Sequence, residues 1–137
     1  MAKLELIPGE QILKQGSVDS IKRGMLQMGR GTLTNQRFVR QTQGIPLISA
    51  MFGALGVLIT RGLTGKVDID LPLSSIKTLT HGKYRLNKNV LVIDTFDGQS
   101  YMLLARFDPW FTAFRDVLQS YGTTLVQVGE KQWAAQR

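Results

Sequence analysis

The chain has 137 residues, 43% of them hydrophobic and 20% charged, which is typical of one globular domain and excludes collagen-like and largely disordered chains. Seventeen lysines and arginines against ten acidic residues give a net charge of +7, which favours polyanionic partners such as lipid phosphates or nucleic acid. Because there is no cysteine and only one histidine, disulfides and Cys-based zinc sites are excluded and Ser/His relays are disfavoured. The N-terminus lacks a long apolar stretch and a small-residue cleavage site, so we expect a cytoplasmic protein that at most associates peripherally with a membrane.

The N-terminal third has the pattern of β-strands. An apolar lead-in ends at a Pro8-Gly9 turn, because proline cannot continue a helix and glycine accepts a positive φ. Residues 11–23 predict a strand with a bulge or bend at Gly16-Ser17. Residues 24–43 predict a β-hairpin, and Asn35 in its connection tolerates the left-handed conformation that a tight turn needs.

Strand patterns return after residue 66. Residues 67–71 alternate strictly between apolar and polar, and a mostly apolar run continues beyond Pro72 to a polar turn expected at residues 81–83. The β-branched run at residues 90–96 predicts a strand, and an Asp97-Gly98 turn connects it to a hairpin partner at residues 100–104.

One amphipathic helix is expected near the C-terminus, with Asp108 as its N-cap, Pro109 at its first position and Gly122 as its C-cap. Its apolar stripe must cover a core, and its members are Trp110, Phe111, Phe114, Val117, Leu118 and Tyr121. The tail, residues 123–137, is expected to be a short helix or a frayed end. Strands followed by one helix, without β-helix-β alternation, predict a mainly β fold: an antiparallel sheet or barrel plugged by the helix.

Four segments, residues 6–13, 31–39, 71–76 and 97–103, precede the helix containing Trp110. In their order and spacing they resemble the bacterial branch of the GRAM domains, small members of the pleckstrin-homology-like superfold. The resemblance implies a partly open, seven-stranded antiparallel barrel closed by the C-terminal amphipathic helix, with no catalysis and with binding of lipid head groups or proteins. The domain would cover residues 4–122, with an apolar insertion at residues 44–65 that the family does not have, expected to be helical.

The whole net charge lies in one window, because residues 20–67 contain seven cations and no acid while the rest of the chain is balanced. This window is either a binding site for anionic lipid or a solvated strand face on which alternate arginines point outward. If lipid binds, the expected contacts are Lys22, Arg23, Arg30, Arg37 and Arg40.

The apolar insertion has three interpretations, since residues 41–60 carry no charge. It inserts into a membrane, it joins copies of the chain into a homo-oligomer, or it packs on the barrel as part of the core. Self-contact or packing is slightly preferred, because a proline and several glycines make a poor membrane span. The expected membrane or oligomer contacts are Ile48, Met51, Phe52, Leu55, Leu58 and Ile59.

No group of residues has the pattern of a catalytic or metal site. His81 is expected in a solvent-exposed turn without a second ligand. The pairs Asp68/Asp70 and Asp94/Asp97 are candidate metal ligands or acid-base groups, but alternation places Asp68 and Asp70 on the outward face of a strand, and Asp97 lies in an ordinary turn. We therefore expect a non-catalytic binding module without cofactor or metal, which associates with anionic lipid head groups or a membrane-linked protein partner. The alternative is a basic nucleic-acid-binding module, which is less favoured because Phe38 is the only aromatic residue among the cations of residues 22–40.

Overall fold

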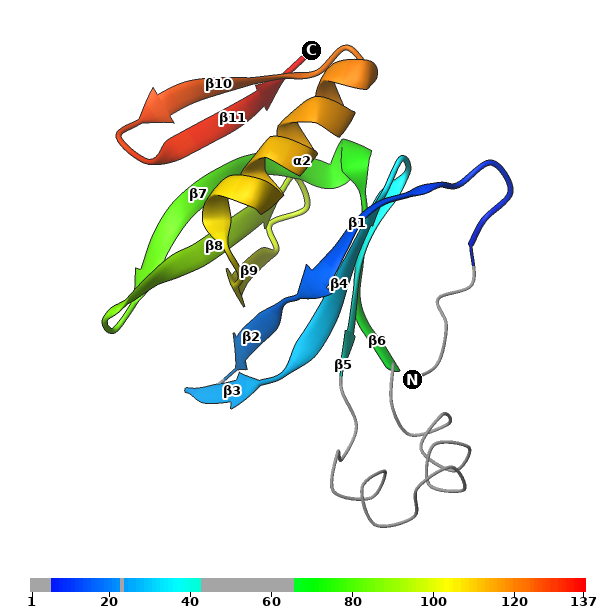
Figure 1. The fold of residues 1–137 in the computed structure, drawn as a ribbon. Coiled ribbons are helices and arrows are strands. Elements are labelled where there is room, and N and C mark those ends of the chain that lie inside the picture. Colours follow the sequence, from blue (N-terminus) through cyan, green and yellow to red (C-terminus); the bar gives the residue numbers. More distant parts are fainter. Residues whose placement is uncertain (1–5, 23, 43–65) are drawn as a thin grey trace, which may run out of the picture.

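Two antiparallel sheets make up most of the described chain (Figure 1). The computed structural model describes residues 6–22, 24–42 and 66–137. The first sheet has the order β1-β4-β5-β6, with bounds β1 Ile12–Ser17, β4 Gly29–Thr34, β5 Arg37–Thr42 and β6 Lys66–Pro72. The second has the order β10-β11-β7-β8-β9-β2-β3, with bounds β10 Thr124–Gly129, β11 Gln132–Gln136, β7 Ile76–Tyr84, β8 Asn87–Thr95, β9 Ser100–Leu104, β2 Asp19–Lys22 and β3 Met25–Gln27.

This architecture confirms the expected mainly β class with a helix near the C-terminus. Between the described strands the two sheets do not join into a closed barrel, and eleven strands replace the seven that the resemblance implied. The chain passes from β1 to β2 at one crossing between the sheets and from β6 through a short 3-10 turn, η1 (Leu73–Ser75), to β7 at another. The predicted insertion at residues 44–65 lies outside the described residues, and so do its six expected contact residues.

The β4–β5 hairpin is confirmed, but its turn is held differently from the prediction. Arg85 is the only described residue other than glycine with a positive φ, so Asn35 does not adopt the left-handed conformation. Its side chain instead accepts a hydrogen bond from the Gln11 amide (2.7 Å) and donates one to the Gly9 carbonyl (3.1 Å). Asn35 therefore ties the N-terminal lead-in to the hairpin.

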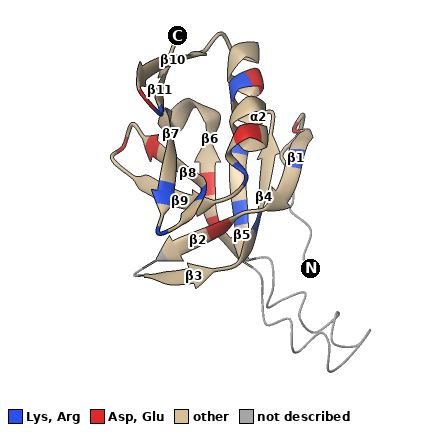
Figure 2. Cartoon of the chain, turned by 60° about the vertical axis from the view of Figure 1, so that its left-hand side comes forward, with Lys and Arg blue, Asp and Glu red and all other residues tan. Residues whose placement is uncertain are grey.

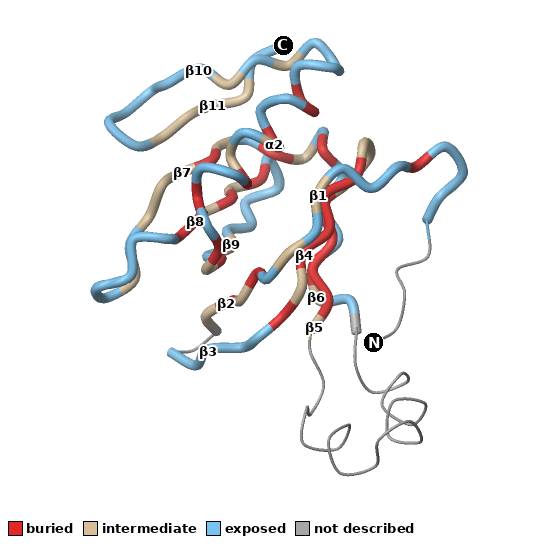
Figure 3. Tube along the Cα trace, in the orientation of Figure 1, coloured by how far each residue is buried: buried red, intermediate tan, exposed pale blue. Residues whose placement is uncertain are grey.

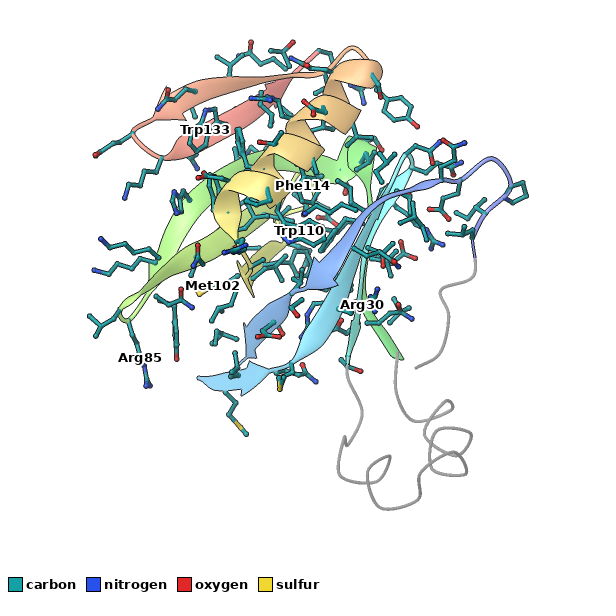
Figure 4. The ribbon with its side chains drawn as sticks, in the orientation of Figure 1. Arg30, Arg85, Met102, Trp110, Phe114 and Trp133 are labelled. Carbon is teal, nitrogen blue, oxygen red and sulfur yellow. The ribbon has the colours of Figure 1, made fainter. Side chains whose placement is uncertain are left out.

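Helix α2 (Phe107–Ser120) covers the core side of both sheets. It begins before the expected position, since Arg106 is its N-cap without a side-chain bond and Asp108 lies inside the first turn. Trp110 and Phe114 are buried against Phe38 of β5, with ring centroids 5.9 and 5.4 Å away (Figure 4). The helix ends at Ser120 with Tyr121 as its C-cap, so Gly122, expected as the C-cap, is the next residue, where its φ of +79° turns the chain out of the helix.

Two predictions for the second half of the chain are wrong. Tyr121 is exposed rather than part of the buried stripe, and its hydroxyl donates a hydrogen bond to the Asn35 carbonyl. The tail is neither helical nor frayed, because β10 and β11 form a hairpin whose second strand pairs with β7. Trp133 of β11 packs on Phe111 of α2, with ring centroids 4.6 Å apart, so the hairpin holds the helix from the side opposite the first sheet (Figure 4).

The polar turn expected at residues 81–83 is also misplaced. These residues belong to β7, and the turn lies at Arg85 and Leu86, where Arg85 has a φ of +55°. The His81 ring stacks on Phe107 at a centroid distance of 4.0 Å, and its Nε2 lies 2.8 Å from the Lys88 carbonyl oxygen. His81 is therefore a half-buried packing residue of a strand and not an exposed loop residue.

Candidate binding surface

Arg40 lies inside the molecule, which corrects the expectation that it faces outward from β5. Its side chain is fully buried, and its guanidinium donates to the Val18 carbonyl (2.8 Å), to the Gln27 carbonyl and to the carboxylate of Asp68. Gly29 leaves room for it, since a Cβ there would lie 2.5 Å from Nη2 of Arg40. A charge this deeply enclosed cannot meet a head group at the surface.

Arg37 is engaged in a network of ion pairs. Its Nε lies 2.9 Å from Glu10 and its Nη1 2.8 Å from Asp70. Burial alone raises the pKa of a carboxyl group, but hydrogen bonds from Arg37, Thr34 and the Ile7 amide outweigh it and hold the pKa of Glu10 at about 2, below its ordinary 4.5. The hydrogen bond to Glu10 in turn raises the pKa of Arg37. This network fastens the N-terminal lead-in to β5 and β6.

The other expected lipid contacts are spread out. Arg30 is half-buried on β4, and its guanidinium lies 3.3 Å from the side-chain oxygen of Gln15 on β1. Lys22 is the last residue of β2, and Arg23 lies outside the described residues. The structure therefore does not gather Arg30, Arg37 and Arg40 into one exposed cluster.

Exposed apolar side chains gather instead on β3 and at Met28, the residue that follows it. Met25, Leu26 and Met28 have exposed fractions of 73%, 57% and 56%, and Figure 3 shows β3 as an exposed strand. The register places them beside the ends of the first sheet, because Gly29 pairs with Thr42 and Thr42 pairs with Lys66. The exposed residues of β3 thus lie at the end of the molecule from which residues 43–65 leave and to which they return.

A second hairpin projects at the same end, as Figure 1 shows. Leu86 at the β7–β8 turn is 91% exposed, and Arg85 lies over the ring of Tyr84 at 5.4 Å. Lys83 and Lys88 flank this turn and are exposed (Figure 2). We call the two hairpins together the basic-apolar end, and it consists of Met25, Leu26, Met28, Lys83, Arg85, Leu86 and Lys88.

Sequence reasoning missed the β7–β8 half of this surface. A signal was present, because residues 71–93 contain four cations and no acid. This local excess of cations was overlooked because positive and negative charges balance over all the residues outside the window at residues 20–67. The misplaced turn also hid the projection of Leu86 and Arg85 into solvent.

The carboxylates considered for metal binding or acid-base chemistry are used in structural contacts. Asp68 pairs with Arg40 and Asp70 with Arg37, Asp94 accepts a hydrogen bond from Thr78, and Asp97 accepts one from Thr95. Asp68 is mostly buried, so its expected outward orientation is wrong, whereas Asp70 is exposed. Within the described ranges no group of three or more His, Asp or Glu residues could hold a metal ion. No helix in those ranges is long and apolar enough to cross a membrane.

A cavity of about 360 Å³ opens beside the C-terminus of α2. Its lining includes the apolar side chains of Leu73 and Leu118, and the titratable side chains among its lining residues are those of Tyr121 and Arg137.

No protein-family model matches the sequence, and no curated protein matches it. Solved structures share its fold, and two of them are compared with this chain. The C-terminal domain of an unknown protein from Leishmania infantum is 14% identical with a TM-score of 0.58, over 80% of this chain and 85% of that one. The N-terminally truncated linker-DH/PH domains of p115-RhoGEF are 10% identical with a TM-score of 0.56, over 90% of this chain but only 32% of that one. At these identities the likeness shows the fold alone, and that fold is PH-like.

Proposed function

We propose that the chain is a non-catalytic, GRAM-like binding module that docks on anionic membrane surfaces through its basic-apolar end. The observation that carries the proposal is the coincidence of highly exposed Met25, Leu26 and Leu86 with exposed cations at one end of the molecule. The PH-like fold supports a binding module in general, and the ligand is argued from this surface alone.

The physical basis is a combination of two moderate attractions. A cation near an anionic membrane surface contributes about 1 kcal/mol, and removal of apolar surface from water contributes about 25 cal/mol per Å². Met25, Leu26 and Leu86 would enter the boundary between head groups and acyl chains. Lys83, Arg85 and Lys88 would stay at head-group level.

The apolar segment at residues 43–65 belongs to the same proposal, because its two ends are fixed at Thr42 and Lys66 beside β3. In this proposal Ile48, Met51, Phe52, Leu55, Leu58 and Ile59 add to the membrane contact. Arg37 and Arg40 serve the fold and not the ligand.

The test is flotation of the purified chain with vesicles of phosphatidylcholine, with and without phosphatidylserine. We expect flotation with the mixed vesicles only. The Lys83→Ala/Arg85→Ala/Lys88→Ala variant should lose about 100-fold in affinity, since each cation contributes about 1 kcal/mol. The Met25→Ser/Leu26→Ser/Met28→Ser variant should also bind more weakly, because it has less apolar surface to insert.

The matched control is Phe96→Ser, since Phe96 is also exposed but lies in the β8–β9 turn. Equal losses in the control and the variants, or equal flotation with neutral vesicles, would contradict the proposal. Competition with single-stranded RNA distinguishes the membrane proposal from the nucleic-acid alternative. Displacement of the protein from vesicles by RNA, but not by detergent micelles, would favour a nucleic-acid-binding module.

A further inference from the structure

The two sheets leave four edge strands, and three of them carry features that discourage pairing with another chain. β1 contains Lys14, β6 contains Asp68, Asp70 and Pro72, and β3 has only three residues. The fourth edge strand is β10, with the sequence Thr-Leu-Val-Gln-Val-Gly. It has neither a charge nor a proline, and its pairing with β11 shifts register only near its C-terminal end, between Gln127 and Gly129, so among these four edges β10 is the least protected against strand addition.

The two faces of β10 have different surroundings. Leu125 packs against the core, and Gln127 pairs in register with Trp133, which packs on α2. Val126 and Val128 lie on the exposed side, with exposed fractions of 37% and 55%. A strand added to β10 would therefore find backbone hydrogen-bonding groups at the edge and a row of valine side chains to pack on.

The charge distribution selects a second copy as the occupant. Two chains of net charge +7 repel each other, but residues 117–129 contain no charged side chain, so like-charge repulsion is small where β10 lies. Antiparallel pairing of two β10 strands about Gln127 sets Val126 of each copy opposite Val128 of the other and brings no like charges together.

We propose that two copies of this chain associate by antiparallel pairing of their β10 edges, forming one continuous sheet across a two-fold axis. Each copy uses its β10 edge once, and the other three edges are protected, so the association closes as a dimer rather than a fibre. The area joined by a six-residue strand is below the ~1,200 Å² of a stable interface, so the dimer is reversible. This inference does not depend on the membrane proposal.

The test is light scattering coupled to size-exclusion chromatography over a dilution series. We expect the mass to rise from monomer towards dimer as concentration increases. Val126→Lys/Val128→Lys should remain monomeric, because four ammonium groups would meet at the two-fold axis. Val67→Lys, an exposed valine on the β6 edge, is the matched control and should dimerise like the unmodified chain.

Hydrogen exchange of the unmodified chain keeps the proposal testable if the double variant fails to fold. Protection of the amides of residues 124–128 should increase with protein concentration, whereas amides of β3 should not change. A monomer at every concentration, an unchanged dimer in the double variant, or loss of the dimer in Val67→Lys would overturn the proposal, and so would protection of β10 that is independent of concentration.

Discussion

Glu10 illustrates how a single side chain can fix a terminal segment that has no regular structure of its own. Its two carboxylate oxygens accept hydrogen bonds from the Ile7 amide (2.8 Å), the Thr34 hydroxyl (2.6 Å) and the Arg37 guanidinium (2.9 Å). Three partners from two segments saturate a buried carboxylate, which compensates for its removal from water. The lead-in before β1 is held by this carboxylate and by Asn35.

The lowered pKa of Glu10 predicts an acid-sensitive contribution to stability. Because its pKa falls from 4.5 to about 2 on folding, the contribution is complete above pH 4.5 and is lost as the pH falls towards 2. Glu10→Gln should therefore flatten the fall of the unfolding free energy between pH 4.5 and 2, measured by urea denaturation at a series of pH values. Asp116→Asn, on an exposed carboxylate of α2, should leave that slope unchanged. An unchanged slope in Glu10→Gln would contradict this role.

At the scale of elements, Gly16 and Gly31 face each other across β1 and β4 but have different space around them. A Cβ at Gly31 would lie 2.5 Å from Cγ2 of Val18 and 3.2 Å from the Phe38 ring, whereas one at Gly16 would lie 3.7 Å from Trp110. Only the 2.5 Å distance between a Cβ at Gly31 and Val18 would be a steric clash.

Gly31→Ala should therefore destabilise the protein by about 1–3 kcal/mol, the usual cost of overpacking a core. Gly16→Ala should be neutral or slightly stabilising, because it fits and it reduces the freedom of the unfolded chain. The midpoints of urea unfolding measure both. Similar midpoints for the two variants would show that the contact between β1 and β4 relaxes more easily than its geometry indicates.

Local sequence signals were sufficient for elements whose side chains make local contacts. The β4–β5 and β8–β9 hairpins and the Gly122 end of α2 were all predicted, because turn residues and alternation carry that information. The position of the β7–β8 turn was not predicted, because Gly82 resembles a turn residue. Gly82 instead leaves room for side chains of the neighbouring strand, because a Cβ at Gly82 would lie 3.0 Å from Val92 and 3.1 Å from Val90.

At the scale of the whole molecule, Arg40 joins the two sheets. Its guanidinium reaches Val18 at the crossing from the first sheet to the second, Gln27 on β3 and Asp68 on β6. Arg40→Ala should lower the free energy of unfolding by about 3–5 kcal/mol, because removal of one member of a buried ion pair leaves the charge of the other uncompensated.

Chemical denaturation of Arg40→Ala beside Arg115→Ala tests this role. Arg115 pairs with Asp116 on the surface of α2 at 3.4 Å, and exposed pairs contribute only about 0–1 kcal/mol. If Arg40→Ala lowered the free energy of unfolding by no more than Arg115→Ala does, Arg40 would not be the residue that joins the two sheets.

The candidate surface could be only partly predicted from the sequence, because both the ion pairs and the surface join residues that are far apart along the chain. Charge counting located seven cations in one window, but it could not show that Arg37 and Arg40 are matched by Glu10, Asp68 and Asp70, two of which lie about thirty residues further along the chain. The basic-apolar end is assembled from β3 and the β7–β8 turn, which lie far apart in the sequence. Only the folded chain brings them to one end.

Both tryptophans of the chain take part in the packing of α2, because Trp110 belongs to the helix and Trp133 of β11 packs on Phe111 of the helix (Figure 4). The intrinsic fluorescence of the protein therefore reports on the packing of the helix between the first sheet and the β10–β11 hairpin. The tryptophan emission spectrum is sensitive to loosening of this half of the molecule, whereas the opposite end, with Met25 and Leu86, contains no tryptophan. An indole introduced at Leu86 would give that end a signal of its own.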